Sequence, residues 1–286
     1  MAKSALLKSS IGKKYWMALT GLFLCVFLLG HLAGNLQLIF GTDLQFNQYA
    51  YFMTTNPAVK VLSYVTYISI LFHAIDGIML AVQNKKARPI GYAKNNAAAN
   101  STWASRNMAV LGTLLLVFIA THMMNFWAKM HFEEMPLQTE VIKIATPMGE
   151  QQFDIHNTTD GAFVLIQVDQ EEKTVYGDPA LGQLELQDGR DFYLGGVKIK
   201  EGYKDLYKIT VDFFKDPTYG LVFTLFYVFS MIVLAFHLSH GFRSAFQSLG
   251  ANNPKYNGLI NVLGLGFAYL VPALFAIIPI YLHFIK

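Results

Sequence analysis

Residues 17–31 read MALTGLFLCVFLLGH, and residues 108–122 read MAVLGTLLLVFIATH. The two stretches share Met, Ala, Gly, Leu, Val, Phe and the final histidine without a gap. A second match joins FHAIDG at residues 72–77 to FHLSHG at residues 236–241, again in register on a histidine. Internal repeats are common in membrane folds, so the chain is predicted to contain two copies of a two-helix unit.

Five apolar segments predict helices that cross a membrane, because each has at least the roughly 20 residues that a helix needs to span a bilayer. Their only charged residues are Asp76 and, near the end of the fourth, Arg243. A hydrophobic fraction of 53% and a charged fraction of 14% agree with an all-α membrane protein. The predicted spans are residues 16–40, 61–84, 107–128, 217–246 and 256–285.

Basic residues mark one side of the predicted membrane. They lie before the first span, between spans two and three, and between spans four and five, in segments that contain no acidic residue. The positive-inside rule makes these segments cytoplasmic and places the N-terminus inside. The net charge of +3 is thus a signal of topology and gives no reason to expect nucleic acid as a partner. These residues are Lys3, Lys8, Lys13, Lys14, Lys85, Lys86, Arg88, Lys94, Arg106, Arg243 and Lys255.

Residues 129–216 differ in composition from the membrane-spanning segments 1–128 and 217–286 on either side. All but two of the 19 acidic residues lie in this connection. Alternating runs at 163–168 (FVLIQV) and 197–200 (VKIK) predict strands, and turn signals such as Asp188-Gly189 separate them. We expect a small β-rich extracytoplasmic insertion between helices three and four, with a loosely ordered loop as the alternative. Its histidines, His131 and His156, are expected to be ordinary surface residues.

Four histidines lie well inside four different spans. Lipid offers an imidazole no hydrogen-bond partner, so a histidine at that depth is costly and usually functional. His31 and His122, the outer pair, each lie 15 residues beyond the inner end of a span. His73 and His237, the inner pair, each lie 10 residues before a glutamine near the inner end. A haem in a helix bundle needs two axial imidazoles at one height, so each pair is predicted to ligate the iron of one haem b.

Other assignments of these polar residues stay open. His240 is the alternative to His237 as the fourth ligand, and His237 is preferred because it matches His73 in the repeat. Zinc or copper would need ligands that converge on one point, whereas these histidines occupy two depths. The single cysteine, Cys25, excludes a covalently attached haem and an iron–sulfur cluster in this chain. Asp76 is either a proton-relay residue or a partner of a neighbouring side chain.

Two further groups of polar residues are candidates for contacts around the haems. Side chains at the inner ends of spans one and three either neutralise haem propionates or anchor the helices in the membrane surface. Amides at and beyond the outer end of span one are candidates for contact with a quinone, although no motif predicts the quinone site. The two groups are Lys13, Lys14, Trp103 and Arg106, and Asn35, Gln37, Asn47 and Gln48.

The runs ALTGLFLCVFLLGH (18–31), LFHAIDG (71–77), VFIATH (117–122) and FHLSHGFRSAFQSLG (236–250) resemble the cytochrome b subunit of succinate dehydrogenase and fumarate reductase, in its single-chain, five-helix, di-haem b558 form. The resemblance covers residues 5–128 and 217–286, and the insertion is longer than the loop expected there. It implies an anchor in the bacterial cytoplasmic membrane that binds a flavoprotein subunit and an iron–sulfur subunit at the cytoplasmic face. Electrons would pass through two haem b to membrane quinone, expected to be menaquinone, with no catalytic residue or dicarboxylate site in this chain.

Two other functions remain open from the sequence. One is the di-haem cytochrome b subunit of a nitrate reductase, formate dehydrogenase or hydrogenase, which differs in the helices that carry the ligands. The other is a non-haem membrane transporter whose histidines form a proton relay. The enzyme that co-purifies with the chain would distinguish the first, and a colourless preparation would indicate the second.

Overall fold

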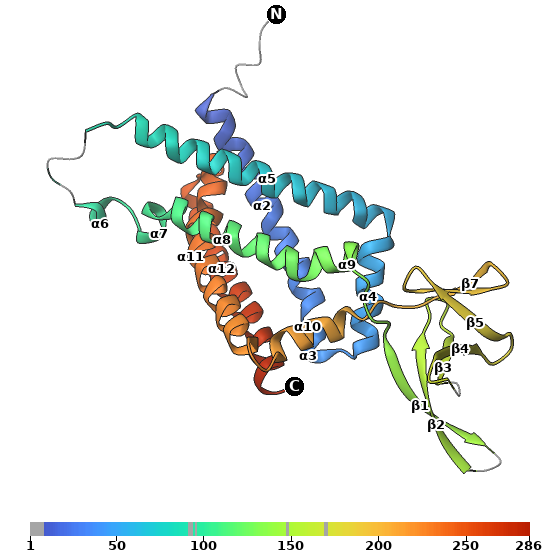
Figure 1. Cartoon of the computed structure of the whole chain (residues 1–286). Coiled ribbons are helices and arrows are strands. Elements are labelled where there is room, and N and C mark those ends of the chain that lie inside the picture. Colours follow the sequence, from blue (N-terminus) through green and yellow to red (C-terminus); the bar gives the residue numbers. More distant parts are fainter. Residues whose placement is uncertain (1–8, 91–93, 95, 147–148, 169–170) are drawn as a thin grey trace, which may run out of the picture.

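The computed structural model describes residues 9–90, 94, 96–146, 149–168 and 171–286, so Lys3 and Lys8 lie outside the described residues. Five helices are long and apolar enough to cross a membrane, as predicted, and a separate β-sheet lies beyond one end of their bundle (Figure 1). Shorter segments continue the first and third helices. The five are α2 (Ser10–Asn35) with α3 (Gln37–Phe40), α5 (Pro57–Lys86), α8 (Met108–His122) with η1 (Met123–Ala128) and α9 (Lys129–Phe132), α11 (Gly220–Ser248), and α12 (Pro254–Phe284).

Local capping sets where two of these helices begin. Both α5 and α12 start at an Asn-Pro pair, where the side chain of Asn56 or Asn253 accepts a backbone hydrogen bond and proline opens the first turn. The helices therefore begin at residues 57 and 254, before the predicted spans at 61 and 256. The difference arises because charge marks the edge of a membrane span, whereas capping marks the end of a helix.

The third long helix changes its winding directly after His122. Residues Met123–Ala128 form a π-helix, and a last turn continues to Phe132. The predicted boundary of the insertion at residue 129 therefore falls inside a helix. Single π-helical turns are rare and occur frequently at functional sites, so the winding change draws attention to His122.

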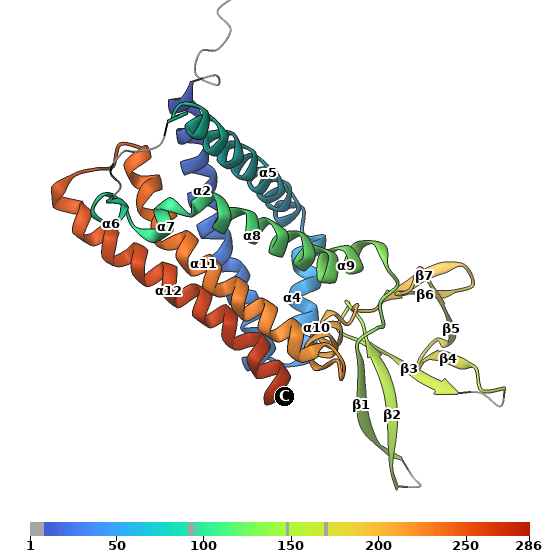
Figure 2. The same ribbon diagram turned by 60° about the vertical axis from the view of Figure 1, so that its left-hand side comes forward.

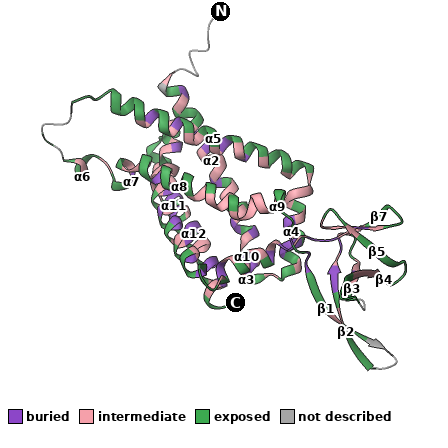
Figure 3. Ribbon diagram, in the orientation of Figure 1, coloured by how far each residue is buried: buried purple, intermediate pink, exposed green. Residues whose placement is uncertain are grey.

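The long helices pack as two pairs that follow the repeat. α2 packs against α5, α8 packs against α11, and α12 packs along α11 and α2. In the apolar windows of α5 and α8 only 17% and 11% of the residues are buried, against 39% in α11. Figure 3 shows the same contrast, with α5 largely exposed and buried residues along α11 and α12. Exposed apolar faces of this kind are what a helix in contact with lipid requires.

The expected β-rich insertion is confirmed, and the alternative of a loose loop is wrong. Seven antiparallel strands pair in sequence order, and Figure 2 shows them apart from the bundle. Two turns contain residues with positive φ, Asp188-Gly189 and Gly195-Gly196, which suits tight hairpins. The strands are β1 (Thr139–Thr146), β2 (Gly149–Asn157), β3 (Phe163–Val168), β4 (Thr174–Asp178), β5 (Gly182–Gln187), β6 (Asp191–Leu194) and β7 (Val197–Glu201).

The sheet has its own core, and His156 belongs to it. Val164 and Phe192 are fully buried in this core. The ring of His156 lies 5.8 Å from that of Tyr176 and 6.2 Å from that of Phe192, and the residue is 8% exposed. The expectation of a surface histidine at position 156 is therefore wrong, because its place in β2 turns it toward the aromatic residues of β4 and β6. His131, in contrast, is exposed.

Two short helices lie at the end of the bundle nearer the sheet, and neither was predicted. They are α4 (Asp43–Thr55), before α5, and α10 (Leu206–Lys215), before α11. α10 buries Tyr207, Thr210 and Phe214 and exposes Lys208, and Asp205 caps its first turn. This spacing of three and four residues is the signature of an amphipathic helix. α10 packs against α4, α11 and α12 at the end of the bundle where the C-terminus lies (Figure 1).

Candidate functional site

The outer pair meets between α2 and the end of α8. The ring centroids of His31 and His122 are 5.8 Å apart, and the two rings are nearly perpendicular, at 86°. Phe27 stacks on His31 at 5.3 Å, and Phe126 lies 5.5 Å from His122. Residues 91 positions apart in the chain are thus brought together within an aromatic environment.

The inner pair meets between α5 and α11. The ring centroids of His73 and His237 are 6.2 Å apart, with 68° between the ring planes. His240 is one turn further along α11 and is partly buried. The ring that faces His73 across the bundle belongs to His237, which is the member of the repeat that the sequence favoured.

Two glycines related by the repeat lie against the inner pair. A methyl group at Gly21 would come within 3.1 Å of Cε1 of His73, and one at Gly112 within 3.8 Å of Cε1 of His237. Ten residues of helix separate Gly21 from His31, and ten separate Gly112 from His122. At 1.5 Å per residue the two histidine pairs are therefore about 15 Å apart along the bundle. The two depths predicted from the spacing are present.

The hydroxyl of Thr20 lies beside Nδ1 of His73. Its oxygen lies 2.8 Å from the carbonyl oxygen of Trp16, to which it donates its only proton, and 3.2 Å from Nδ1 of His73. In the Nδ1–H tautomer of His73, the hydroxyl accepts a hydrogen bond from the imidazole. Nε2 of His73 then keeps its lone pair, which is the state that a metal ligand requires.

The other three rings differ in their polar neighbours. Nδ1 of His122 lies 3.4 Å from the hydroxyl of Tyr227, and Nδ1 of His31 lies 3.4 Å from the amide of Asn35. Nδ1 of His237 is buried and has no hydrogen-bond partner among the described residues. A buried polar atom without a partner costs about 1–3 kcal/mol, so this nitrogen requires a metal or a polar group that the described residues do not supply.

The donor set fits a haem better than a metal ion held by protein ligands alone. An imidazole nitrogen binds a metal at about 2 Å, and the ring centroid lies about 1 Å further out, so two axial rings have centroids about 6 Å apart. Both separations, 5.8 and 6.2 Å, agree with this value. They also fall within the ordinary range of edge-to-face ring contacts. Within the described part of the chain no group of three or more His, Cys, Asp or Glu residues could hold a metal ion.

Asp76 lies on the face of α5 that turns into the bundle. The buried residues of this helix are Thr66, Ser69, Asp76 and Leu80, and His73 falls on the same stripe. No hydrogen bond or ion pair joins Asp76 to another residue in the described ranges, and it is 9% exposed. Both interpretations of this carboxylate, a proton relay and a partner of a neighbour, stay predictions.

Several of the candidate contact residues have structural partners of their own. The ring of Trp103 packs 5.4 Å from Phe236, next to His237, and Arg106 donates to the carbonyl groups of Ala97 and Ser101. Asn47 is 1% exposed, and both its amide nitrogen and its amide oxygen are hydrogen-bonded within the protein. Both ends of its amide are thus used within the protein, and contact of Asn47 with quinone stays a prediction.

No protein-family model, curated protein or solved structure matches the chain. The family resemblance of the four sequence runs, and the roles that it implies for the histidines, therefore stay predictions. What the structure adds is geometric. It brings together the members of each predicted pair, places the pairs at two depths, and leaves one buried histidine nitrogen without a partner among the described residues.

Proposed function

We propose that this chain is the di-haem cytochrome b membrane anchor of a succinate:quinone oxidoreductase, either a succinate dehydrogenase or a fumarate reductase. The observation that carries the proposal is the meeting of four histidines of the long apolar helices as two pairs at two depths. A haem b bound at each pair would supply a one-electron carrier within the membrane. A proton relay is less favoured, because Thr66 and Ser230, near the inward faces between the two depths, donate their protons to carbonyl groups of their own helices.

The chain's own residues would position and tune these carriers. His31 and His122 would hold the outer haem, and His73 and His237 the inner haem. The hydrogen bond between Thr20 and His73 would fix one ring in its ligating tautomer. Gly21 and Gly112 keep the helix surface beside the inner pair free of side chains.

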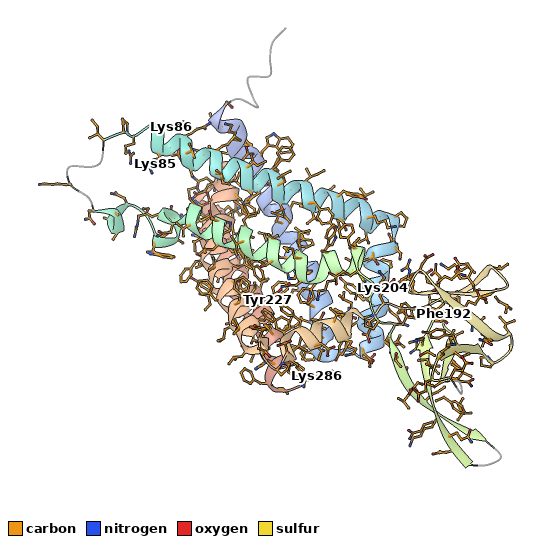
Figure 4. All side chains as sticks on the ribbon, viewed as in Figure 1. Lys85, Lys86, Phe192, Lys204, Tyr227 and Lys286 are labelled. Atoms are coloured by element: carbon orange, nitrogen blue, oxygen red, sulfur yellow. The ribbon has the colours of Figure 1, made fainter. Side chains whose placement is uncertain are left out.

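The proposed partners bind at the end of the bundle opposite the sheet. Figure 4 labels Lys85 and Lys86 at this end and Lys286 at the other. In the proposed orientation, the basic end faces the cytoplasm of a bacterial cell and receives the iron–sulfur subunit and the flavoprotein subunit. Electrons would pass between the iron–sulfur subunit and menaquinone in the membrane. The distance of about 15 Å between the two pairs sets the spacing of the carriers.

The first experiment is a dithionite-reduced minus oxidised spectrum of the purified chain, with haem b quantified per polypeptide. Two haems per chain are expected. His237→Ala should remove the inner haem alone, whereas His131→Ala, which changes an exposed histidine at the end of the third helix, should retain both. A folded chain without haem would contradict the proposal and favour a transporter. Co-purification with a molybdenum or nickel enzyme would identify a different respiratory cytochrome b.

A further inference from the structure

Helix α10 covers the outer pair with aromatic side chains. The ring of Phe213 lies 5.3 Å from that of Phe126, and the ring of Phe214 lies 5.1 Å from that of Tyr227. Phe126 and Tyr227 are themselves ring neighbours of His122. One layer of side chains therefore separates α10 from the outer histidines. These residues belong to the largest hydrophobic core of the chain.

The opposite face of α10 is exposed to solvent. Lys208 and Asp212 form an ion pair in which both side chains are more than half exposed, and Lys215 is also exposed. The helix thus separates an aqueous surface from the aromatic side chains around His122. An amphipathic helix at this position has the form of a cover between water and a buried site.

Both ends of α10 are tied to other elements. At its start, the buried amide of Asn47 in α4 donates to Asp205 at 2.9 Å and accepts from the backbone N–H of Tyr207 at 2.9 Å. At its end, Nδ1 of His283 in α12 lies 2.6 Å from the carbonyl oxygen of Phe214. Because Asn47 is completely enclosed, its two hydrogen bonds have no water to replace them.

We infer that α10 is a cap that excludes water from the outer haem, and that Asn47 is the positioning residue that holds this cap in place. The inference rests on the proposed function, because the cap acts on the group that His31 and His122 would bind. An oxidised haem iron carries one more positive charge than a reduced one, and a water-free environment disfavours that charge. Entry of water at α10 would stabilise the oxidised form and lower the midpoint potential of the outer haem.

The test is a potentiometric titration of both haems in the full chain carrying Asn47→Leu. Leucine has the same number of side-chain heavy atoms and the same branching but forms neither hydrogen bond. We expect the oxidised-to-reduced ratio of the outer haem at a fixed potential to rise about tenfold, which is a shift of about 59 mV for one electron, while the inner haem is unchanged. The matched control is Lys208→Ala, which alters only the exposed face of α10. His122→Ala assigns the outer transition by removing it.

Two further measurements keep the inference open to refutation. Phe213→Ala opens the covering face directly and should shift the same haem, even if Asn47→Leu fails to fold. Hydrogen exchange of the backbone amides of residues 206–215 should be faster in Asn47→Leu than in Lys208→Ala. Unchanged outer potentials in both Asn47→Leu and Phe213→Ala, equal shifts of both haems, or unchanged amide exchange would each overturn the cap. A wild-type chain without haem would instead refute the proposed function, and the amide exchange would still test whether Asn47 holds α10 in place.

Discussion

Replacing Gly21 by alanine tests the packing of the inner pair. The added methyl group would lie 3.1 Å from Cε1 of His73, which is closer than carbon atoms normally approach. The ring cannot retreat freely, because its Nδ1 is held by the hydroxyl of Thr20 on the same helix as Gly21. Overpacking of this kind costs about 1–3 kcal/mol. Alanine in place of a helical glycine stabilises the helix by roughly 0.5–1 kcal/mol. This gain is smaller than the cost of overpacking, so the net change is destabilising.

Two other glycines provide matched controls on the same pair of repeat-related helices. Around Gly30, in α2, a new methyl group would meet no described atom within 4 Å. Gly30→Ala should therefore stabilise the chain slightly, through the higher helix propensity of alanine alone. At Gly112 the nearest atom is Cε1 of His237 at 3.8 Å, an ordinary contact, and Gly112→Ala should be close to neutral. We therefore expect Gly21→Ala to be less stable than Gly30→Ala by about 1–3 kcal/mol.

The assay is unfolding of the purified chain in mixed detergent micelles, with the content of inner haem followed in the same samples. Gly21→Ala should unfold at a lower denaturant fraction than either control and should lose inner haem first. Equal stability of Gly21→Ala and Gly30→Ala, with the inner haem unaltered, would refute the close approach of α2 to His73. Loss of the outer haem alone would contradict the placement of Gly21 at the inner depth.

Two further predictions concern Thr20 and the sheet. Thr20→Val should remove the hydroxyl that contacts Nδ1 of His73 and destabilise the chain by about 1 kcal/mol, whereas Thr20→Ser should retain the contact; detergent unfolding and the spectrum of the inner haem distinguish the two variants. Burial lowers the pKa of His156 below its ordinary value of 6.5, although the carbonyl of Gln138 opposes the shift. The unfolded sheet therefore binds a proton more readily, and its stability should fall as the pH drops below 6.5 toward the folded pKa. The β3 amides should be less protected at pH 5 than at pH 7 once each exchange rate is divided by the intrinsic rate at that pH, and this difference should be abolished in His156→Asn; equal protection at the two pH values would contradict it.

The repeat and the long apolar segments made much of the helical bundle predictable from sequence. Each histidine is at a fixed number of residues from the end of its helix, and helical rise is constant, so depth follows from counting. The strands at 163–168 and 197–200 were predictable because alternation of apolar and polar residues has a period of two. In these cases the local pattern and the tertiary structure impose the same requirement.

The remaining features depend on contacts between distant parts of the chain. Asn47 reads as an ordinary polar loop residue, and only the approach of Asp205, 158 residues later, makes it a buried partner. The burial of His156 depends on Tyr176 and Phe192, which other strands contribute. α10 did leave a signal, an Asp at its N-cap and apolar residues at helical spacing, but the acidic and strand-rich sequence around it obscured that pattern.

The position of α10 shows that the sheet is an insertion into one copy of the repeat. In each copy of the repeat a short helix stands before the second long helix, α4 before α5 and α10 before α11, and these two short helices pack against each other. The sheet is inserted in the second copy only, directly before α10. Its two ends meet where the N–H of Asp205 donates to the carbonyl of Pro136 at 2.8 Å. A lineage could thus gain, lose or exchange the whole sheet through a single short junction, leaving the paired helices and their histidines unaltered.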